Sequence, residues 1–176
     1  MILKDSFSKF SNISKLSGCI AFFTNEKSEL THLKKYFNSS NYKNLTVLFK
    51  KKNKKKGLLS FDLNPNQKII LISLKKNQKS NEAEKSGAKL TDFLNSDGAG
   101  TVHIISDTIS VNLKSDAIYE FLHGMRLKSY SFDRYKSKKD SKILKVNMIS
   151  SKKFNKKIYD KFKAIELGVN YTKDLV

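Results

Sequence analysis

The chain has a single cysteine, Cys19, and no tryptophan in its 176 residues. One thiol cannot form an intrachain disulfide, so the disulfide framework of small secreted domains is excluded. Residues 16–19 spell a bacterial lipoprotein cleavage box, but residues 4–15 carry charged side chains where such a signal needs an unbroken apolar core. We therefore expect Cys19 to be a buried structural thiol and the chain to be cytoplasmic.

Long apolar runs are also missing. The apolar run at residues 19–23 is far shorter than the roughly 20 residues that cross a bilayer, and we expect no membrane association. The chain is nevertheless rich enough in apolar material to fold, because 39% of its residues are hydrophobic and 12 are phenylalanine. Its length suits one domain, residues 1–176.

Arginine is scarce although the chain is strongly basic. The formal net charge is +19, yet Arg126 and Arg134 are the only arginines among 35 basic residues. A charge of this size favours adhesion to nucleic acid or anionic lipid. Lysine, however, lacks the bidentate fork with which arginine reads bases and clamps phosphates. We therefore expect a solvated lysine-rich surface and only weak, non-specific, salt-sensitive binding of nucleic acid.

The sequence contains no recognisable catalytic pattern. Its 16 acidic residues are scattered along the chain. The three histidines, His32, His103 and His123, are not spaced as the ligands of a metal ion usually are. We expect a structural or surface role for His123, one position off the apolar face of its helix. The glycines at 98 and 100 precede a strand instead of a helix, which favours a turn over a phosphate site. The sequence thus assigns no catalytic, cofactor-binding or metal-binding residue, and the chain alone is not expected to be an enzyme.

Apolar periodicity predicts strands that alternate with helices. The expected strands are 18–24, 45–49, 58–63, 68–74, 101–105 and 142–149, and the expected helices are 30–37, 81–97, 114–132 and 155–176. The lysine-rich segment 50–56 is expected to link a hairpin of 45–49 with 58–63. This order predicts a three-layer α/β domain whose sheet is mixed, mainly parallel and flanked by helices.

Two positions in the predicted helices carry further expectations. Gly124 lies on a helical turn where a neighbouring element can approach closely. Asn155 can cap the final helix, and we expect residues 155–166 of that helix to cover the sheet.

Two segments resemble a known family. Residues 132–139 read Phe-Asp-Arg-Tyr-Lys-Ser-Lys-Lys, and residues 168–176 read Gly-Val-Asn-Tyr-Thr-Lys-Asp-Leu-Val. The first is similar to the Phe-Asp-Arg-Tyr-Lys-Thr-Lys-Lys run of leucyl (cytosol) aminopeptidases. The second resembles the segment that leads this family into an Asn-Glu-Pro motif. The chain departs from the family at two positions: Tyr171 stands where leucine is more usual, and the strand that ends at residues 72–75 lacks an expected glycine. The chain is identified as resembling the family's N-terminal domain.

The resemblance implies a macro-domain-like α/β fold joined to a two-metal peptidase that removes N-terminal amino acids from peptides. Zinc or manganese would be held by the parent's catalytic domain, which has no counterpart here and toward which the final helix, about 155–176, would lead. The parent enzymes are homo-hexamers, and some bind DNA. The expected role of this chain is therefore non-catalytic, in structure, assembly or regulation, with the catalytic domain as its partner.

Two other functions are open at this stage. A stand-alone basic nucleic-acid-binding module is favoured by the charge and by the DNA-binding members of the family that the chain resembles. The aromatic side chains of Tyr130, Phe132 and Tyr135 alternate with basic ones, as in grooves that bind single-stranded nucleic acid. An ADP-ribose-binding macro domain is favoured by fold analogy alone, which is weak support for a function.

Overall fold

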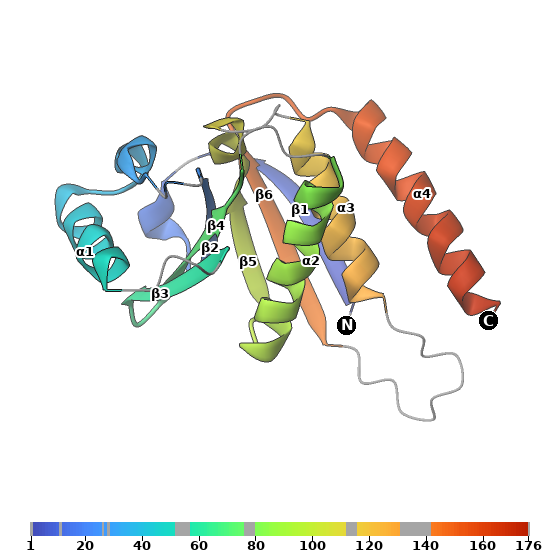
Figure 1. Ribbon diagram of the computed structural model, residues 1–176, viewed down its shortest axis with the longest axis horizontal. Helices are drawn as coiled ribbons and strands as arrows, with labels where there is room; N and C mark the ends of the chain where they lie inside the picture. Colours follow the sequence, from blue (N-terminus) through green and yellow to red (C-terminus); the bar gives the residue numbers. More distant parts are fainter. Residues whose placement is uncertain are drawn as a thin grey trace.

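A six-stranded sheet with helices on both faces forms the body of the protein (Figure 1). The computed structural model describes residues 2–10, 12–25, 27, 29–51, 57–75, 80–111, 116–130 and 142–175. The segment 132–139 and most of the lysine-rich segment, residues 52–56, lie outside the described residues.

The strands run mostly parallel. They are β1 (Ile2–Lys9), β2 (Gly18–Thr24), β3 (Leu58–Asn64), β4 (Gln67–Ser73), β5 (Thr101–Ile105) and β6 (Ile143–Ser150). Their order across the sheet is β1-β6-β5-β2-β4-β3, and only the pair β3 and β4 is antiparallel. The helices are α1 (Ser39–Lys50), α2 (Ser80–Ser96), α3 (Ala117–Ser129) and α4 (Lys156–Asp174), and the 3₁₀ helices are η1 (Ile13–Lys15), η2 (Thr31–Tyr36) and η3 (Ser106–Val111). The predicted α/β class with a mixed, mainly parallel sheet is confirmed.

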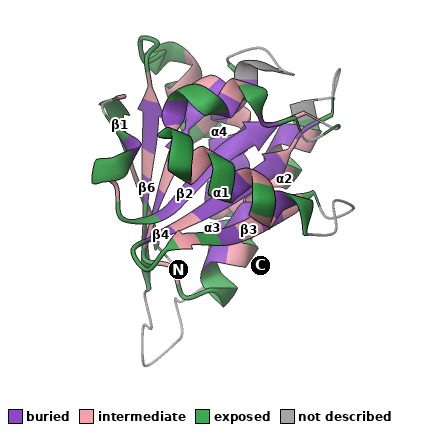
Figure 2. Ribbon diagram, turned by 90° about the vertical axis from the view of Figure 1, so that its left-hand side faces the viewer, coloured by how far each residue is buried: buried purple, intermediate pink, exposed green. Residues whose placement is uncertain are grey.

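The central strand β2 supplies side chains to a core on each face of the sheet. Ala21 and Phe23 pack with α2 and α3 in what we call the first core, whereas Ile20 and Phe22 pack with η2 and α1 in the second core, on the second face of the sheet. Every residue from Cys19 to Thr24 is buried, as the purple centre of Figure 2 shows. Burial on both faces explains why this strand reads as an unbroken apolar run without alternation.

The second face of the sheet is covered over only part of its width. Helix α1 lies over the β2, β4 and β3 side, while none of the helices that the structure describes covers β1 and β6 there (Figure 2). Ile2 and Lys4 of β1 and their register partners Ile143 and Lys145 of β6 are exposed. No element was assigned to residues 2–9 from the sequence, since an edge strand with one open face carries few apolar residues and shows little periodicity.

The expected strand at 45–49 is wrong, since these residues belong to α1. The side-chain oxygen of Asn38 accepts a hydrogen bond from the backbone of Asn41 at 2.8 Å and starts the helix. Leu45 and Phe49, four residues apart, are buried in the second core. Short apolar runs fit a strand and a helix equally well, and here the cap upstream decides.

The expected hairpin is wrong for the same reason. Strand β3 pairs with β4 and not with 45–49, and the two strands turn at Pro65 and Asn66. The expected helix at 30–37 is a 3₁₀ helix, η2, that ends before α1 begins. The end of α2 is as predicted, because Gly98 adopts a positive φ of 72° just beyond it.

Helices α2 and α3 touch at their backbones. A Cβ atom on Gly124 of α3 would lie 2.6 Å from the carbonyl carbon of Glu84 in α2, and closer still to its oxygen. On Gly87 of α2 it would lie 2.9 Å from the carbonyl carbon of Phe121. Thr91 then bridges the helices, since its hydroxyl is 3.3 Å from the carbonyl oxygen of Met125. The close approach predicted at Gly124 is confirmed.

Candidate functional site

Arg126 joins α3, β1 and α4 from a buried position. Only 5% of its side chain is exposed, and its Nη2 donates to Oδ2 of Asp5 at 2.8 Å. The hydroxyl of Tyr159 in α4 donates to the same oxygen at 2.9 Å, and the guanidinium lies 4.5 Å from the centre of the Tyr159 ring. A buried carboxylate is costly unless donors satisfy it, so this contact ties the three elements together.

Glu166 of α4 is the weaker partner of Arg126. Its Oε2 lies 3.7 Å from Nη1, well beyond the 2.8 Å contact to Asp5. Burial raises the pKa of Glu166, Asp5 adds to the rise, and Arg126 opposes it. Burial and the hydrogen bond to Asp5 also raise the pKa of Tyr159, which keeps its hydroxyl a donor. Arg126 therefore compensates mainly Asp5.

Helix α4 lies beside α3 and does not cross the sheet (Figure 1). Ile158, Tyr159 and Phe162 are half-buried against the first core, and no residue of α4 is fully buried. Asn155 caps the helix as predicted, accepting a hydrogen bond from the backbone of Ile158. Residues 155–166 contact the sheet at its β1 edge, where the Tyr159 hydroxyl donates to Asp5 and the Tyr159 ring lies 5.4 Å from that of Phe7, while α2 and α3 pack over the middle of that face.

The far side of α4 carries an exposed apolar row. Leu167, Tyr171 and Leu175 are 64%, 66% and 66% exposed. Their four-residue spacing places them on one side of the helix, and we call them the α4 outer row. Contiguous exposed apolar side chains are typical of a surface that contacts another protein or domain.

The histidines lie in separate places. His32 Nε2 is 2.9 Å from the carbonyl oxygen of Phe23, and His103 Nδ1 is 3.3 Å from the side-chain amide nitrogen of Asn147. His123 is buried in α3 against the ring of Phe162, 5.1 Å away. Within the described ranges, no three His, Cys, Asp or Glu residues are grouped so that they could hold a metal ion.

Cys19 is a buried thiol in β2, as predicted. Burial raises its pKa above the usual value, and Asp97 adds to the rise. A raised pKa keeps the sulfur protonated and disfavours a nucleophilic role. Of the helices whose residues the structure describes, none is long and apolar enough to cross a bilayer.

Acidification is expected to destabilise the protein through His123. Burial lowers its pKa below the ordinary 6.5, so the folded state holds the ring neutral while the unfolded chain takes up a proton below that pH. This contribution to stability is present above pH 6.5 and is lost as the pH falls toward the folded pKa. The Nδ1 atom has no partner among the described residues, so His123→Phe should preserve stability at neutral pH.

Urea unfolding of the wild type and His123→Phe between about pH 7 and pH 5 measures the effect. The wild type should lose more stability than the variant as the pH falls. Equal losses in the two proteins would contradict the assignment.

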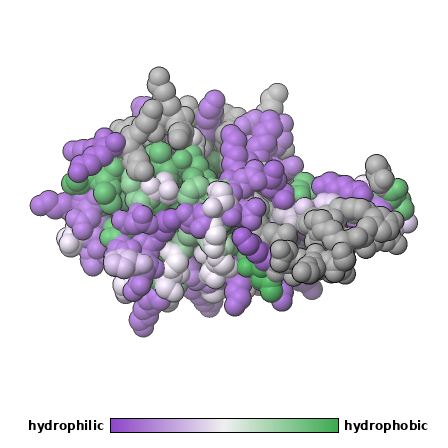
Figure 3. All heavy atoms as spheres, turned by 90° about the horizontal axis from the view of Figure 1, so that it is seen from below, coloured by the Kyte–Doolittle hydropathy of each residue, from purple (hydrophilic) through white to green (hydrophobic). Residues whose placement is uncertain are grey.

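Hydrophilic side chains dominate the face seen from below (Figure 3). One of the aromatic residues that suggested base stacking is engaged within the protein. The hydroxyl of Tyr130 donates to Asp174, and Lys173 Nζ lies 4.9 Å from the centre of the Tyr130 ring. Phe132 and Tyr135 lie outside the described residues.

Comparison with known proteins connects this fold to a family. A sequence profile described as the cytosol aminopeptidase family, N-terminal domain, matches residues 20–139, more than half of the chain. This range includes the predicted signature segment 132–139 and stops before the segment 168–176. No curated protein sequence matches the chain.

Solved structures share the fold at low sequence identity. A tomato leucine aminopeptidase mutant is 11% identical with a TM-score of 0.70, and the match covers 95% of this chain and 36% of that one. The bottromycin maturation enzyme BotP is 10% identical with a TM-score of 0.63, covering 91% of this chain and 32% of that one. BotP in complex with Mn is 9% identical with a TM-score of 0.62, at the same coverage. The chain thus spans about a third of the length of these proteins, and through the profile match it belongs to the cytosol aminopeptidase family, in the part that forms the N-terminal domain.

Proposed function

We propose that this chain is a non-catalytic domain that supports or assembles a metal-dependent leucyl aminopeptidase. The α4 outer row carries the proposal, because its three exposed apolar side chains suit a surface that a further domain covers. The family match and the coverage of about a third of the solved structures support it.

The metal and the peptide chemistry belong, in this proposal, to the partner domain. A two-metal hydrolase needs several anionic ligands around both ions. The described residues do not fit such a site, because they contain no group of three potential ligands. One of the solved structures with this fold is BotP in complex with Mn, and zinc or manganese would serve the catalytic domain here.

The purified chain is expected to show no peptidase activity. Leucine p-nitroanilide is incubated with the protein and added Mn²⁺ or Zn²⁺, and the released nitroaniline is followed by absorbance. No release above the blank is expected, because the described residues contain no cluster of ligands that could hold a pair of metal ions. Metal-dependent release that co-purifies with the chain would contradict the non-catalytic role.

The identity of the partner is tested by the coding sequence after Val176. An in-frame continuation that encodes a lysine- and aspartate-bearing metal site would support docking of α4 onto a domain of the same polypeptide. A reading frame that ends without such a site would contradict that arrangement.

A further inference from the structure

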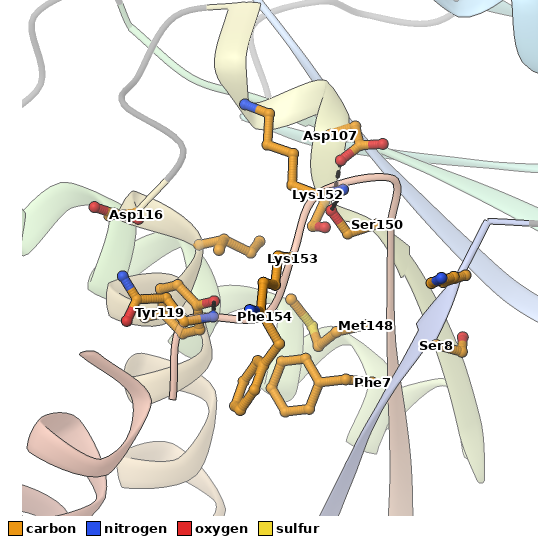
Figure 4. Close-up of a pocket in the computed structure, with 14 residues that line it drawn as sticks. Phe7, Ser8, Asp107, Asp116, Tyr119, Met148, Ser150, Lys152, Lys153 and Phe154 are labelled. Carbon is orange, nitrogen blue, oxygen red and sulfur yellow. Dashed lines mark hydrogen bonds between the residues drawn. The ribbon is translucent and has the colours of Figure 1, made fainter. Parts of the chain in front are cut away.

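A cavity of about 350 Å³ opens where β1, β6 and η3 meet the start of α4 (Figure 4). It lies at the carboxyl ends of the parallel strands β1 and β6, next to the point where β5 continues into η3. Open α/β sheets commonly bind ligands at this edge, and a cavity of this size is in the range of small-molecule sites.

One half of the cavity is aromatic. The rings of Phe7 and Phe154 lie 4.1 Å apart, centre to centre, and each side chain is still more than a third exposed. Met148 is buried beneath them, and the ring of Tyr119 lies 6.0 Å from Phe154. Figure 4 shows Phe7, Phe154 and Met148 converging on one end of the cavity. A flat apolar ring placed here would remove both exposed phenylalanines from water.

The position of Phe154 is set by its neighbours. The backbone N–H of Asn155 donates to the Tyr119 hydroxyl at 2.6 Å, while the Asn155 side chain caps α4. The aromatic wall is therefore held between α3 and α4 before any ligand arrives, which reduces the entropy lost on binding.

The other half of the cavity is charged. Lys152 and Lys153 line it together with Asp107 and Asp116, and no described carboxylate lies within ion-pair distance of either lysine. Asp107 is already engaged, because it accepts hydrogen bonds from the Ser150 hydroxyl at 2.6 Å and the Ser151 backbone at 2.8 Å. Burial alone would raise the pKa of Asp107, but these hydrogen bonds and the charge of Lys152 outweigh it and the pKa is lowered. Neither lysine therefore has a direct ion-pair partner among the described carboxylates, and the acid group of a ligand can supply one.

We propose that this cavity binds an aromatic carboxylate, with its ring against Phe7 and Phe154 and its acid group toward Lys152 and Lys153. This inference is independent of the proposed role as a non-catalytic domain. It follows from the joining, in one cavity, of a partly exposed aromatic wall with two lysines that form no ion pair with a described carboxylate.

The test is an NMR titration of the ¹⁵N-labelled chain with 2-naphthoate. Saturable shifts confined to the ends of β1 and β6, the start of α3 and residues 152–155 are expected. Lys152→Ser/Lys153→Ser should bind about tenfold more weakly, the effect of losing one to two charge-assisted contacts. Phe154→Ser should weaken binding independently of charge.

Three controls make the proposal falsifiable. Lys43→Ser/Lys50→Ser removes two exposed lysines of α1 on the opposite face, and should leave the affinity unchanged. The neutral 2-naphthamide should bind clearly more weakly, and equal affinity would overturn the role of the lysines. Shifts spread over the whole molecule, or binding of ADP-ribose but not naphthoate at this cavity, would overturn the ligand class.

Discussion

Gly124→Ala is expected to lower the free energy of unfolding by about 3 kcal/mol, at the upper end of the effect of overpacking a core. The new methyl group would meet the backbone of Glu84, which belongs to the α2 helix and cannot rotate away as a side chain would. Relief requires α2 and α3 to separate, which disrupts the first core between them and the sheet. Urea or guanidinium unfolding measures the loss.

Two matched variants accompany this measurement. Gly87→Ala meets the backbone of Phe121 in the same contact and should destabilise the protein comparably. Gly168→Ala adds the same methyl group inside α4 with no atom within 4 Å, and should stabilise the protein by up to about 1 kcal/mol, the helix propensity gained over glycine. If Gly124→Ala left the free energy of unfolding unchanged or raised it, as Gly168→Ala should, the backbone contact between α2 and α3 would be disproved.

Arg126→Met is expected to lower the free energy of unfolding by about 3 kcal/mol. The change leaves the Asp5 carboxylate, only 11% exposed, without its main cationic partner, and an unpaired buried charge is strongly destabilising. Because Tyr159 and Glu166 also face this arginine, hydrogen exchange should accelerate along α4. Chemical unfolding gives the energy, and exchange measured by mass spectrometry gives its location.

Replacing both Asp5 and Arg126 distinguishes the cost of an unpaired charge from the cost of lost packing. Asp5→Leu/Arg126→Met removes the orphaned charge and should recover much of the loss. Lys128, also in α3, forms an ion pair with Asp92 of α2, and both side chains are about half exposed. Lys128→Met breaks this exposed ion pair and should change stability little. Equal effects of Arg126→Met and Lys128→Met would show that the buried network does not anchor α4.

Features encoded within a few consecutive residues were predictable. The apolar runs of β2 and β5 gave both strands their observed bounds, because strands buried on both faces need no polar positions. Asn155 was identified as a cap from its place before an apolar helical pattern. Gly124 was identified as a contact point because a missing side chain on a helical turn admits a neighbour, although the neighbour itself was not known.

Prediction from local sequence patterns failed where the apolar residues of a segment fit both the helical and the strand period, or neither. The run at 45–49 suits a strand as well as a helix, and the cap at Asn38 with burial in the second core made it α1. Strand β1 has too few apolar residues to be recognised from its sequence. It is a strand because its backbone pairs with β6.

The sequence by itself determined the α/β class, the strands β2 and β5 and the absence of a known catalytic motif, because short periods and turn residues express these directly. The family was identified from the resemblance of residues 132–139 and 168–176 to leucyl aminopeptidases. Only the tertiary structure decided which distant residues meet. Arg126 and Asp5 are 121 positions apart, and the cavity joins the end of β1 to the start of α4. Such sites depend on strand order and helix packing, which no local segment of the chain specifies.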